Sequence, residues 1–184
     1  VINRVASSKK ITKLIVSSSL KKNDDELINY LKKNKIKFFR GDLENVAMRL
    51  YKTAIKHKAK FFVRISGDSP LIDPKLIDKA IKISKKNKNY DIVTNVFPRT
   101  FSKGQSVEVI KTSILKKYSR NFSKLDKEHV TKYFYKNFNK FLIKNFTFSD
   151  KNKTMKLSID TKKDLKNILK KFNKKKFKNY SIQL

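Results

Sequence analysis

Apolar and polar positions follow each other along this chain in two rhythms, one typical of buried strands and one typical of amphipathic helices. Short apolar runs bounded by polar residues predict strands at 13–18, 36–40, 59–65 and 90–96. Between these runs, apolar positions three or four residues apart predict helices at 24–34, 43–57 and 74–84. Strands that alternate with helices predict a parallel sheet with helices on both faces, which is an α/β fold.

Beyond Pro98 the pattern still predicts strands and helices, but they no longer alternate regularly. Asp126 is the expected N-cap of its helix, and Thr161 with Asp164 predicts a capping box with Asp at the usual Glu position. No internal repeat and no linker rich in Pro, Gly or Ser interrupts the chain, so a single domain is expected. The predicted strands of this half are 106–110, 141–148 and 156–159, and its predicted helices are 112–122, 126–138 and 161–172.

Composition narrows the class of protein. With 184 residues, of which 39% are hydrophobic and 14 are Phe, the chain is able to bury a core and is not a disordered tail. Cys is absent, which excludes disulfides and thiolate metal sites. No apolar stretch approaches the roughly 18 residues of a membrane span, and VINRVASSKK lacks the apolar centre of a signal peptide. We therefore expect a cytoplasmic protein with no membrane partner.

A formal net charge of +32 raises the question of a nucleic-acid partner. Arg, whose forked guanidinium suits bases and phosphates, occupies only six of the 47 basic positions. The others are Lys, spread over nearly every predicted helix beside many Asn. This distribution favours a compositional bias on solvated faces, so we expect no specific nucleic-acid partner, although the charge attracts anions such as nucleotides.

Two aspartates stand where predicted strands end. Asp68 follows the strand at 59–65 in the sequence Gly-Asp-Ser-Pro, and Asp160 follows the strand at 156–159. Gly, Asp and Pro are common turn residues, so an ordinary strand exit explains both positions. In a parallel sheet, however, both exits can lie at the same carboxyl edge, where two carboxylates are able to hold Mg²⁺ beside substrate phosphates. The spacing by itself leaves both interpretations open.

Five blocks of the sequence resemble one family in their order and spacing. They are FFRGDLENVAMRLYKTA, VRISGDSPLIDPKLIDKAI, DIVTNVFPRTFSKGQSVEVI, DKEHVTKYFY and LSIDTKKDL, and the resemblance extends over residues 12–172. The family is the cytidylyltransferases of the spore-coat polysaccharide biosynthesis type, which are related to the acylneuraminate and 3-deoxy-manno-octulosonate cytidylyltransferases. The resemblance implies a three-layer, Rossmann-like nucleotide-diphosphosugar transferase fold with a mostly parallel sheet. It also implies transfer of CMP from CTP to a sugar or sugar acid, with release of pyrophosphate and with Mg²⁺ as cofactor.

The resemblance places catalytic and metal-binding roles on the same two aspartates. Asp68 matches the family's metal-binding Asp after the third preserved strand, and Asp160 matches the second metal-binding Asp. The block around the second reads IDTKKD, in which Lys162 and Lys163 replace the family's Pro and Glu while the Asp-Thr pair is kept. Asp73 also matches, but it precedes a proline and is expected to cap the next helix.

Other residues are candidates through the same resemblance. Arg64 stands inside a predicted strand, where a charged side chain needs a phosphate or an acidic partner. Lys103 stands where the family often has Arg, so recognition of an acidic sugar is expected to be altered. A position in a solvent-exposed loop explains this Lys equally well. His129 is also explained by packing against neighbouring aromatic rings. The nucleotide-binding candidates are Arg40, Gly41, Arg64 and Gly67, and the substrate-binding candidates are Asn95, Arg99, Lys103, Glu108 and His129.

One part of the family's pattern is missing from this sequence. Family chains open with a strand and a Gly-rich loop whose backbone N–H groups wrap the triphosphate, whereas this chain has only three glycines, none of them in such a loop, and begins at Val1. We therefore expect an N-terminally truncated chain, whose activity alone is in question. Two alternatives stay open: a nucleotidyltransferase for another NTP or a glycosyltransferase of the same fold, and a basic nucleic-acid-binding protein. The resemblance also favours a homodimer through the segment around 97–140.

Overall fold

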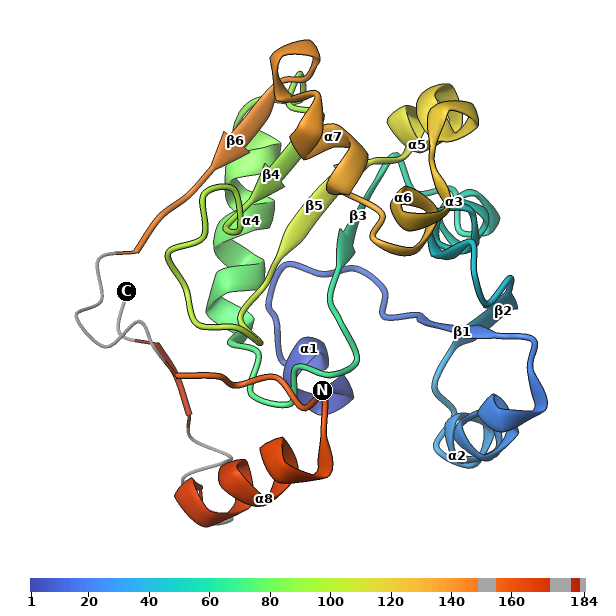
Figure 1. The fold of residues 1–184 in the computed structure, drawn as a ribbon, viewed down its shortest axis with the longest axis vertical. Coiled ribbons are helices and arrows are strands. Elements are labelled where there is room, and N and C mark those ends of the chain that lie inside the picture. Colours follow the sequence, from blue (N-terminus) through green and yellow to red (C-terminus); the bar gives the residue numbers. More distant parts are fainter. Residues whose placement is uncertain (149–154, 173–179, 183–184) are drawn as a thin grey trace. The chain divides into compact units, whose positions relative to one another are not determined.

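The strands belong to two sheets in the computed structural model, which describes residues 1–148, 155–172 and 180–182 (Figure 1). One sheet has the strand order β1-β2 and the other has the order β3-β5-β4-β6. Helices connect most of the strands, so the predicted α/β class is confirmed. None of the described helices has the length and apolar composition that crossing a membrane requires.

The strands are β1 (Val16–Ser19), β2 (Phe38–Gly41), β3 (Phe61–Arg64), β4 (Ile92–Thr94), β5 (Glu108–Lys111) and β6 (Ile143–Asn145). The α-helices are α1 (Ile2–Ala6), α2 (Asp25–Lys33), α3 (Val46–Lys56), α4 (Pro74–Lys86), α5 (Thr112–Tyr118), α6 (Lys124–Glu128), α7 (Lys132–Lys136) and α8 (Lys162–Lys171), with 3-10 turns η1 (Lys22–Asp24), η2 (Ser119–Asn121) and η3 (Phe138–Lys140).

The chain forms two compact units from interleaved segments. The first unit comprises Val1–Ile11, Val63–Val109 and Ile143–Leu184, and the second comprises Thr12–Phe62 and Ile110–Leu142. The chain passes from one unit to the other within strand β3 and again within strand β5. No linker marks these crossings in the sequence, because they lie inside regular strands, and the single domain expected from the sequence stays a prediction.

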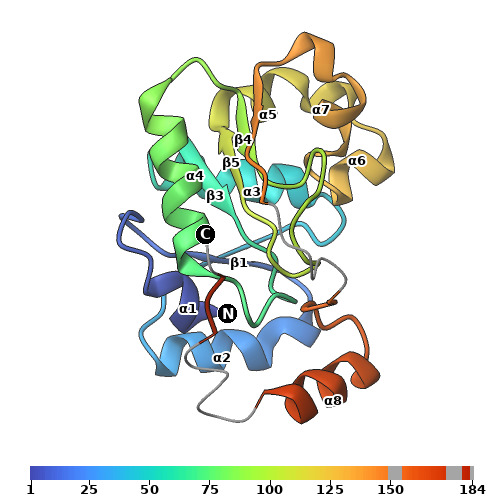
Figure 2. The same ribbon diagram turned by 90° about the vertical axis from the view of Figure 1, so that its left-hand side faces the viewer.

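In the first unit, helix α4 lies along one face of the four-stranded sheet and contacts β4 (Figures 1 and 2). Its start is set locally, since the Asp73 side chain accepts a hydrogen bond of 2.8 Å from the N–H of Lys75. Pro74 occupies the first turn, where its missing N–H costs nothing. Asp73 therefore caps this helix, as expected from the sequence. The buried face of α4 consists of Leu76, Ile77, Ala80, Ile81 and Ser84.

Each unit contains a pair of parallel strands. In the first unit β4 runs parallel to β6, with Ile92 opposite Ile143. In the second unit β1 runs parallel to β2, with Val16 opposite Phe38, and α2 supplies the crossover that parallel neighbours need. The core of the second unit contains a cluster of aromatic rings from Tyr118, Phe122, Tyr133, Phe134 and Phe141.

Two predicted elements differ from the structure. The helix expected at 126–138 is divided into α6 and α7, and it starts earlier because Ser123, not Asp126, is the N-cap. Asp126 occupies the third helical position instead, where its carboxylate accepts a hydrogen bond from the N–H of Ser123 and completes a capping box. The strand expected at 156–159 lies outside every described strand, because two of its N–H groups bond to loops instead of a neighbouring strand.

Candidate active site

Asp68 lies in the turn that follows β3, as the strand-exit pattern predicted. Oδ1 of its carboxylate accepts a hydrogen bond of 2.8 Å from the hydroxyl of the next residue, Ser69. Ser69 is buried, whereas Asp68 is half-buried. The carboxylate is thus held through one oxygen by its own neighbour, and among the described residues Oδ2 has no hydrogen-bond partner.

A segment late in the chain brings Asp160 to this turn. The N–H of Ile159 donates a hydrogen bond of 2.8 Å to the carbonyl oxygen of Asp68. Two residues earlier, the N–H of Leu157 donates a bond of 2.8 Å to the carbonyl oxygen of Lys103. The segment therefore runs between two loops of the first unit, and the two aspartates become spatial neighbours.

Close backbone packing holds this segment in place. Gly104 has φ +93°, and a Cβ built there would lie 2.5 Å from the carbonyl carbon of Leu157 and 2.7 Å from the nitrogen of Ser158. Only glycine permits this approach without strain. Below the loops, Leu71, Leu157 and Ile168 pack as one buried cluster, which joins the turn, the segment and α8.

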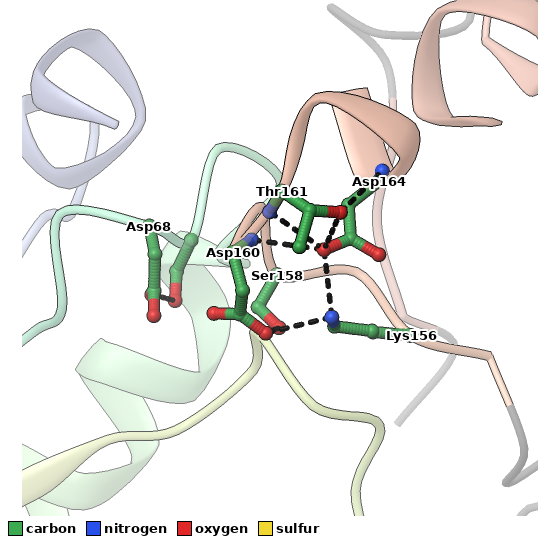
Figure 3. A network of polar contacts seen from close by, with 7 residues as sticks. Asp68, Lys156, Ser158, Asp160, Thr161 and Asp164 are labelled. Carbon is green, nitrogen blue, oxygen red and sulfur yellow. Dashed lines mark hydrogen bonds and ion pairs between the residues drawn. The ribbon is translucent and has the colours of Figure 1, made fainter. Parts of the chain in front are cut away.

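The carboxylate of Asp160 belongs to a polar network centred on Lys156 (Figure 3). Nζ of Lys156 lies 2.7 Å from Oδ2 of Asp160 and 2.7 Å from Oδ2 of Asp164. Asp164 is anchored further, because its Oδ2 also accepts hydrogen bonds from the N–H groups of Asp160 and Thr161. Thr161 and Asp164 form the capping box of α8, which confirms that prediction. Asp160 turns its other oxygen towards the side on which Asp68 lies (Figure 3).

The network fixes the charges of two of its members. Hydrogen bonds to Asp160 and Asp164 raise the pKa of the Lys156 ammonium above its usual value. The hydrogen bond from Lys156 is the largest of several contacts that lower the pKa of Asp164 to about 2. At neutral pH, Lys156 is therefore a cation and Asp164 an anion, and a positive charge stands beside Asp160.

The oxygen atoms of the aspartate pair suit a hard divalent cation. Asp68 offers Oδ2 and Asp160 offers Oδ1, and neither of these atoms has a partner among the described residues. Within the same residues, no group of three or more His, Cys, Asp or Glu side chains gathers. Mg²⁺ is commonly bound through one or two carboxylates, with waters and substrate phosphates as its other ligands. Two carboxylates with free oxygens fit that pattern.

Arg64 and Glu108, which were candidates for nucleotide and substrate contacts, contact each other. Nη1 of Arg64 lies 2.5 Å from Oε2 of Glu108, whose side chain is only 3% exposed. Their strands, β3 and β5, are neighbours in the sheet. The protein itself thus supplies the acidic partner that a charged side chain inside a strand requires, and a ligand contact by either residue stays a prediction.

The loop between β4 and β5 uses Asn95 to hold its own shape. Nδ2 of this fully buried side chain donates a bond of 2.7 Å to the carbonyl oxygen of Gln105, and Oδ1 accepts one of 2.9 Å from the N–H of Val107. Both ends of the amide therefore serve the backbone. Arg99 and Lys103 are exposed on the same loop, so their charged groups are the accessible ones among the substrate candidates here.

In the second unit, Arg40 and Gly41 lie on β2. The guanidinium of Arg40 donates hydrogen bonds of 2.8 and 2.9 Å to the carbonyl oxygens of Ser19 and Lys21, and it lies 2.7 Å from a carboxylate oxygen of Asp25. Arg40 thus ties β2 to the start of α2. Its predicted role in nucleotide binding is untested by these contacts.

The two remaining candidates are exposed. Gly67 lies in the turn before Asp68, and a Cβ there would meet nothing within 4 Å. His129 is the C-cap of α6 and its side chain is exposed, and its role in substrate binding stays a prediction. The helix ends there, before the chain enters the aromatic core.

Three residues of the site were not found from the sequence. Lys156 holds Asp160, Ser69 holds Asp68, and Gly104 admits the segment that carries Asp160. Lys156 carries no sequence signal, since Lys is the commonest residue in this sequence. Gly104 did carry a sequence signal, because glycine is rare in this sequence, with only three residues.

Comparisons with known proteins extend this description. A family model described as cytidylyltransferase matches residues 1–183. The chain is 33% identical over 168 residues to an uncharacterized protein of Methanocaldococcus jannaschii, which covers 90% of this chain and 68% of that protein. It is 31% identical over 123 residues to the spore coat polysaccharide biosynthesis protein SpsF of Bacillus subtilis, which covers 65% of this chain and 49% of that protein. The match thus spans about half the length of the second relative.

Solved structures show the same architecture. A cytidylyltransferase from Leptospira borgpetersenii serovar Hardjo-bovis matches with a TM-score of 0.86 at 26% identity, over 100% of this chain and 86% of that chain. A CMP:2-keto-3-deoxy-manno-octonic acid synthetase, solved in complex with CTP, matches with a TM-score of 0.66 at 11% identity, over 90% of this chain and 83% of that chain. The second likeness concerns the fold alone. The Rossmann-like fold expected from the sequence is confirmed.

Proposed function

The chain belongs to the cytidylyltransferase family, and from that premise we propose that the protein transfers CMP from CTP to a hydroxyl group of a sugar or sugar acid, with release of pyrophosphate. The observation that carries the proposal is the pairing of Asp68 and Asp160. The hydrogen bond from Ile159 to the Asp68 carbonyl aligns their two loops, and each carboxylate keeps one oxygen without a partner among the described residues.

In the proposed reaction, a hydroxyl oxygen of the acceptor forms a bond to the α-phosphorus of CTP. The bond between that phosphorus and the bridging oxygen of pyrophosphate breaks, pyrophosphate leaves with the electron pair, and the hydroxyl proton passes to solvent. Charge builds on the phosphate oxygens, so alignment and charge stabilisation account for most of the catalysis. Asp68 and Asp160 would hold Mg²⁺, which when bound supplies positive charge to the phosphates.

The chain's own residues prepare the two carboxylates for this role. Ser69 holds one oxygen of Asp68, and Lys156 holds one oxygen of Asp160. The bond from Ser69 orients the free oxygen of Asp68 before any ligand arrives, which lowers the entropic cost of binding, whereas Asp160 exchanges one cationic partner for another when a metal ion binds. The formal net charge of +32 attracts the anionic triphosphate from a distance.

The acceptor is a sugar or sugar acid in the biosynthesis of a surface polysaccharide or glycan, a choice supported by the likeness to SpsF. Arg99 and Lys103 offer exposed cationic groups for such an acceptor. The carbonyl oxygen of Lys103 is bonded to the N–H of Leu157, in the segment that ends at Asp160. The loop with the cationic groups and the segment with the metal ligand are therefore fixed to one another.

The active form is a homodimer, assembled through the segment around 97–140. Leu125 and Phe138 of this segment are 44% and 59% exposed. Large exposed apolar side chains of this kind are frequent at protein interfaces. Light scattering after gel filtration tests the dimer, and the mass of a single chain at micromolar concentration contradicts it.

Pyrophosphate release from CTP, UTP, GTP and ATP, measured with Mg²⁺ and a panel of neutral sugars and sugar acids, tests the reaction. We expect release from CTP with one class of acceptor, and loss of release in the Asp68→Asn and Asp160→Asn variants. Glu26→Gln, which removes one charge from the exposed face of α2, is the matched control. Preference for another nucleotide favours the alternative NTP. Release of a nucleoside diphosphate in place of pyrophosphate identifies a glycosyltransferase, and no release from any nucleotide overturns the proposal.

The dependence of nucleic-acid binding on salt concentration distinguishes a nucleic-acid-binding protein from the proposed enzyme. A protein that binds duplex DNA or RNA specifically keeps a measurable preference for its site while its affinity falls steeply with ionic strength. We expect only weak binding without sequence preference, lost at about 0.2 M salt, because the lysines are dispersed and their interactions are screened within roughly 10 Å. A site preference that survives at this salt concentration would favour the alternative.

A further inference from the structure

The ammonium of Lys156 lies beside the carboxylate of Asp160, which in the proposed function binds a divalent cation. Its Nζ lies 2.7 Å from Oδ2 of Asp160. An ammonium and a metal ion that share one carboxylate repel each other, although both are attracted to it. The protein therefore carries an internal competitor at its own candidate metal ligand.

Lys156 does not depend on Asp160 for its position. The same Nζ lies 2.7 Å from Oδ2 of Asp164, and that oxygen is fixed by the N–H groups of Asp160 and Thr161 and by the Thr161 hydroxyl. An ammonium has three N–H donors. Lys156 is therefore able to release Asp160, remain bound to Asp164 and offer a donor to another anion.

The contact with Asp160 is of a kind that exchanges readily. The side chain of Asp160 is 52% exposed and that of Lys156 is 39% exposed. Ion pairs at this degree of exposure contribute little to stability, because solvent screens them and both side chains lose freedom when they pair. The contact therefore matters less for folding than for which cation occupies Asp160.

We propose that Lys156 is an internal counter-cation of the aspartate pair, which weakens the binding of free divalent cations and releases Asp160 when the cation arrives with a nucleoside triphosphate. The triphosphate supplies negative charge that offsets the repulsion between the Lys156 ammonium and the divalent cation. A phosphate oxygen then accepts the hydrogen bond that Lys156 had donated to Asp160. The divalent cation then enters together with its nucleotide and not before it. This inference rests on the proposed function of Asp68 and Asp160.

Binding of Mn²⁺, counted by electron paramagnetic resonance, tests the first half of the proposal in nucleotide-free protein. Removing the charge in Lys156→Met or Lys156→Gln is expected to tighten Mn²⁺ binding about threefold to tenfold, from the screened repulsion of one nearby charge. Lys156→Arg keeps the charge and is expected to stay within about twofold of the wild type. Lys166→Met is the matched control, because Lys166 is exposed on α8 and is involved in no ion pair among the described residues.

Binding of Mn²⁺ with CTP tests the second half. The ratio of the Mn²⁺ dissociation constants without and with CTP measures how far the nucleotide assists the cation. We expect this ratio to fall at least about threefold in Lys156→Met, since the repulsion that the nucleotide offsets is gone. The melting temperature of this variant is expected to fall modestly, because the substitution also removes the contact of Nζ with Asp164, whose side chain is only 15% exposed, so the Mn²⁺ constants are measured well below the melting transition.

The outcomes separate the role of Lys156 from the proposed function. Unchanged or weaker Mn²⁺ binding in both Lys156→Met and Lys156→Gln overturns the counter-cation. A second outcome is that the wild type binds Mn²⁺ with CTP, that Asp68→Asn abolishes this binding, and that the Lys156 variants behave like the wild type. In that case only the proposed role of Lys156 is wrong. If the wild type binds no Mn²⁺ with or without CTP, the metal site and the counter-cation fall together.

Discussion

The backbone N–H of Ile159 lies 2.8 Å from the carbonyl oxygen of Asp68, and this bond aligns two loops that are far apart in the sequence. It places Asp160, the next residue along the segment, beside the turn that carries the first aspartate. Two ionised carboxylates repel each other, so their proximity is not maintained by their own side chains. The backbone bond and the apolar cluster of Leu71, Leu157 and Ile168 hold them together instead.

Replacing Asp68 by Asn is expected to lower the rate of pyrophosphate release from CTP by at least about a hundredfold, because it removes charge stabilisation from the transition state. Asp160→Asn is expected to have an effect of the same order. Steady-state rates with saturating Mg²⁺ measure the loss. Asp73→Asn is the contrast, since Asp73 caps α4 and is bonded to Ser181, so it should lower the melting temperature but spare turnover. Unchanged turnover in Asp68→Asn would show that its metal role is wrong.

Replacing Gly104 by Ala is expected to destabilise the protein by about 2 kcal/mol, because its φ is positive and the new Cβ collides with backbone atoms. The collision is with Leu157 and Ser158, at 2.5 to 2.7 Å. The displaced segment carries Asp160, so turnover should fall as well. Gly67→Ala is the matched control for stability, because a Cβ there meets nothing within 4 Å. Urea unfolding of both variants and turnover of Gly104→Ala measure the effects, and equal free energies of unfolding in the two variants contradict the packing argument.

Acid is expected to weaken the attachment of α8 through Asp164. Its pKa in the folded protein is about 2, below the roughly 3.9 of an unfolded Asp. A lowered folded pKa means that the stabilisation is fully present above pH ~4 and is lost as the pH falls through about 2. Melting temperatures of the wild type and Asp164→Asn, compared between about pH 5 and pH 2, should therefore converge towards the acid end. A gap that stays constant over this range contradicts the assignment.

Replacing Arg64 by Met is expected to lower the free energy of unfolding by about 3 kcal/mol, because it leaves the buried carboxylate of Glu108 without its guanidinium. The double variant Arg64→Met/Glu108→Gln should recover part of this loss, since no charge is then buried. Urea unfolding of the single and double variants gives the coupling free energy. A loss below about 1 kcal/mol would show that the pair behaves as a solvated one. CTP affinity that falls in Arg64→Met but not in Glu108→Gln would support the nucleotide contact.

The sequence by itself determined the order of the strands and helices and several of their ends. The alternation of apolar and polar positions predicted the strand at 59–65 and the helix at 74–84, and the structure has β3 and α4 there. The capping box of Thr161 and Asp164 was also readable, because a cap involves residues three apart. Asp68 could be placed at a strand exit for the same reason, since the signals that end an element lie within a few residues of it, whereas Asp160 follows an extended segment that is not a strand.

Only the tertiary structure decided which residues meet. Lys156 pairs with Asp160 in an extended segment that was predicted to be a strand, and Arg64 pairs with Glu108 across two strands. The bond that joins the aspartates runs between backbone groups, which nearly every residue has, so the sequence carries no mark of it. With Lys on so many positions, Lys156 could not be distinguished from the other lysines in the sequence, and only the fold shows that it pairs with Asp160.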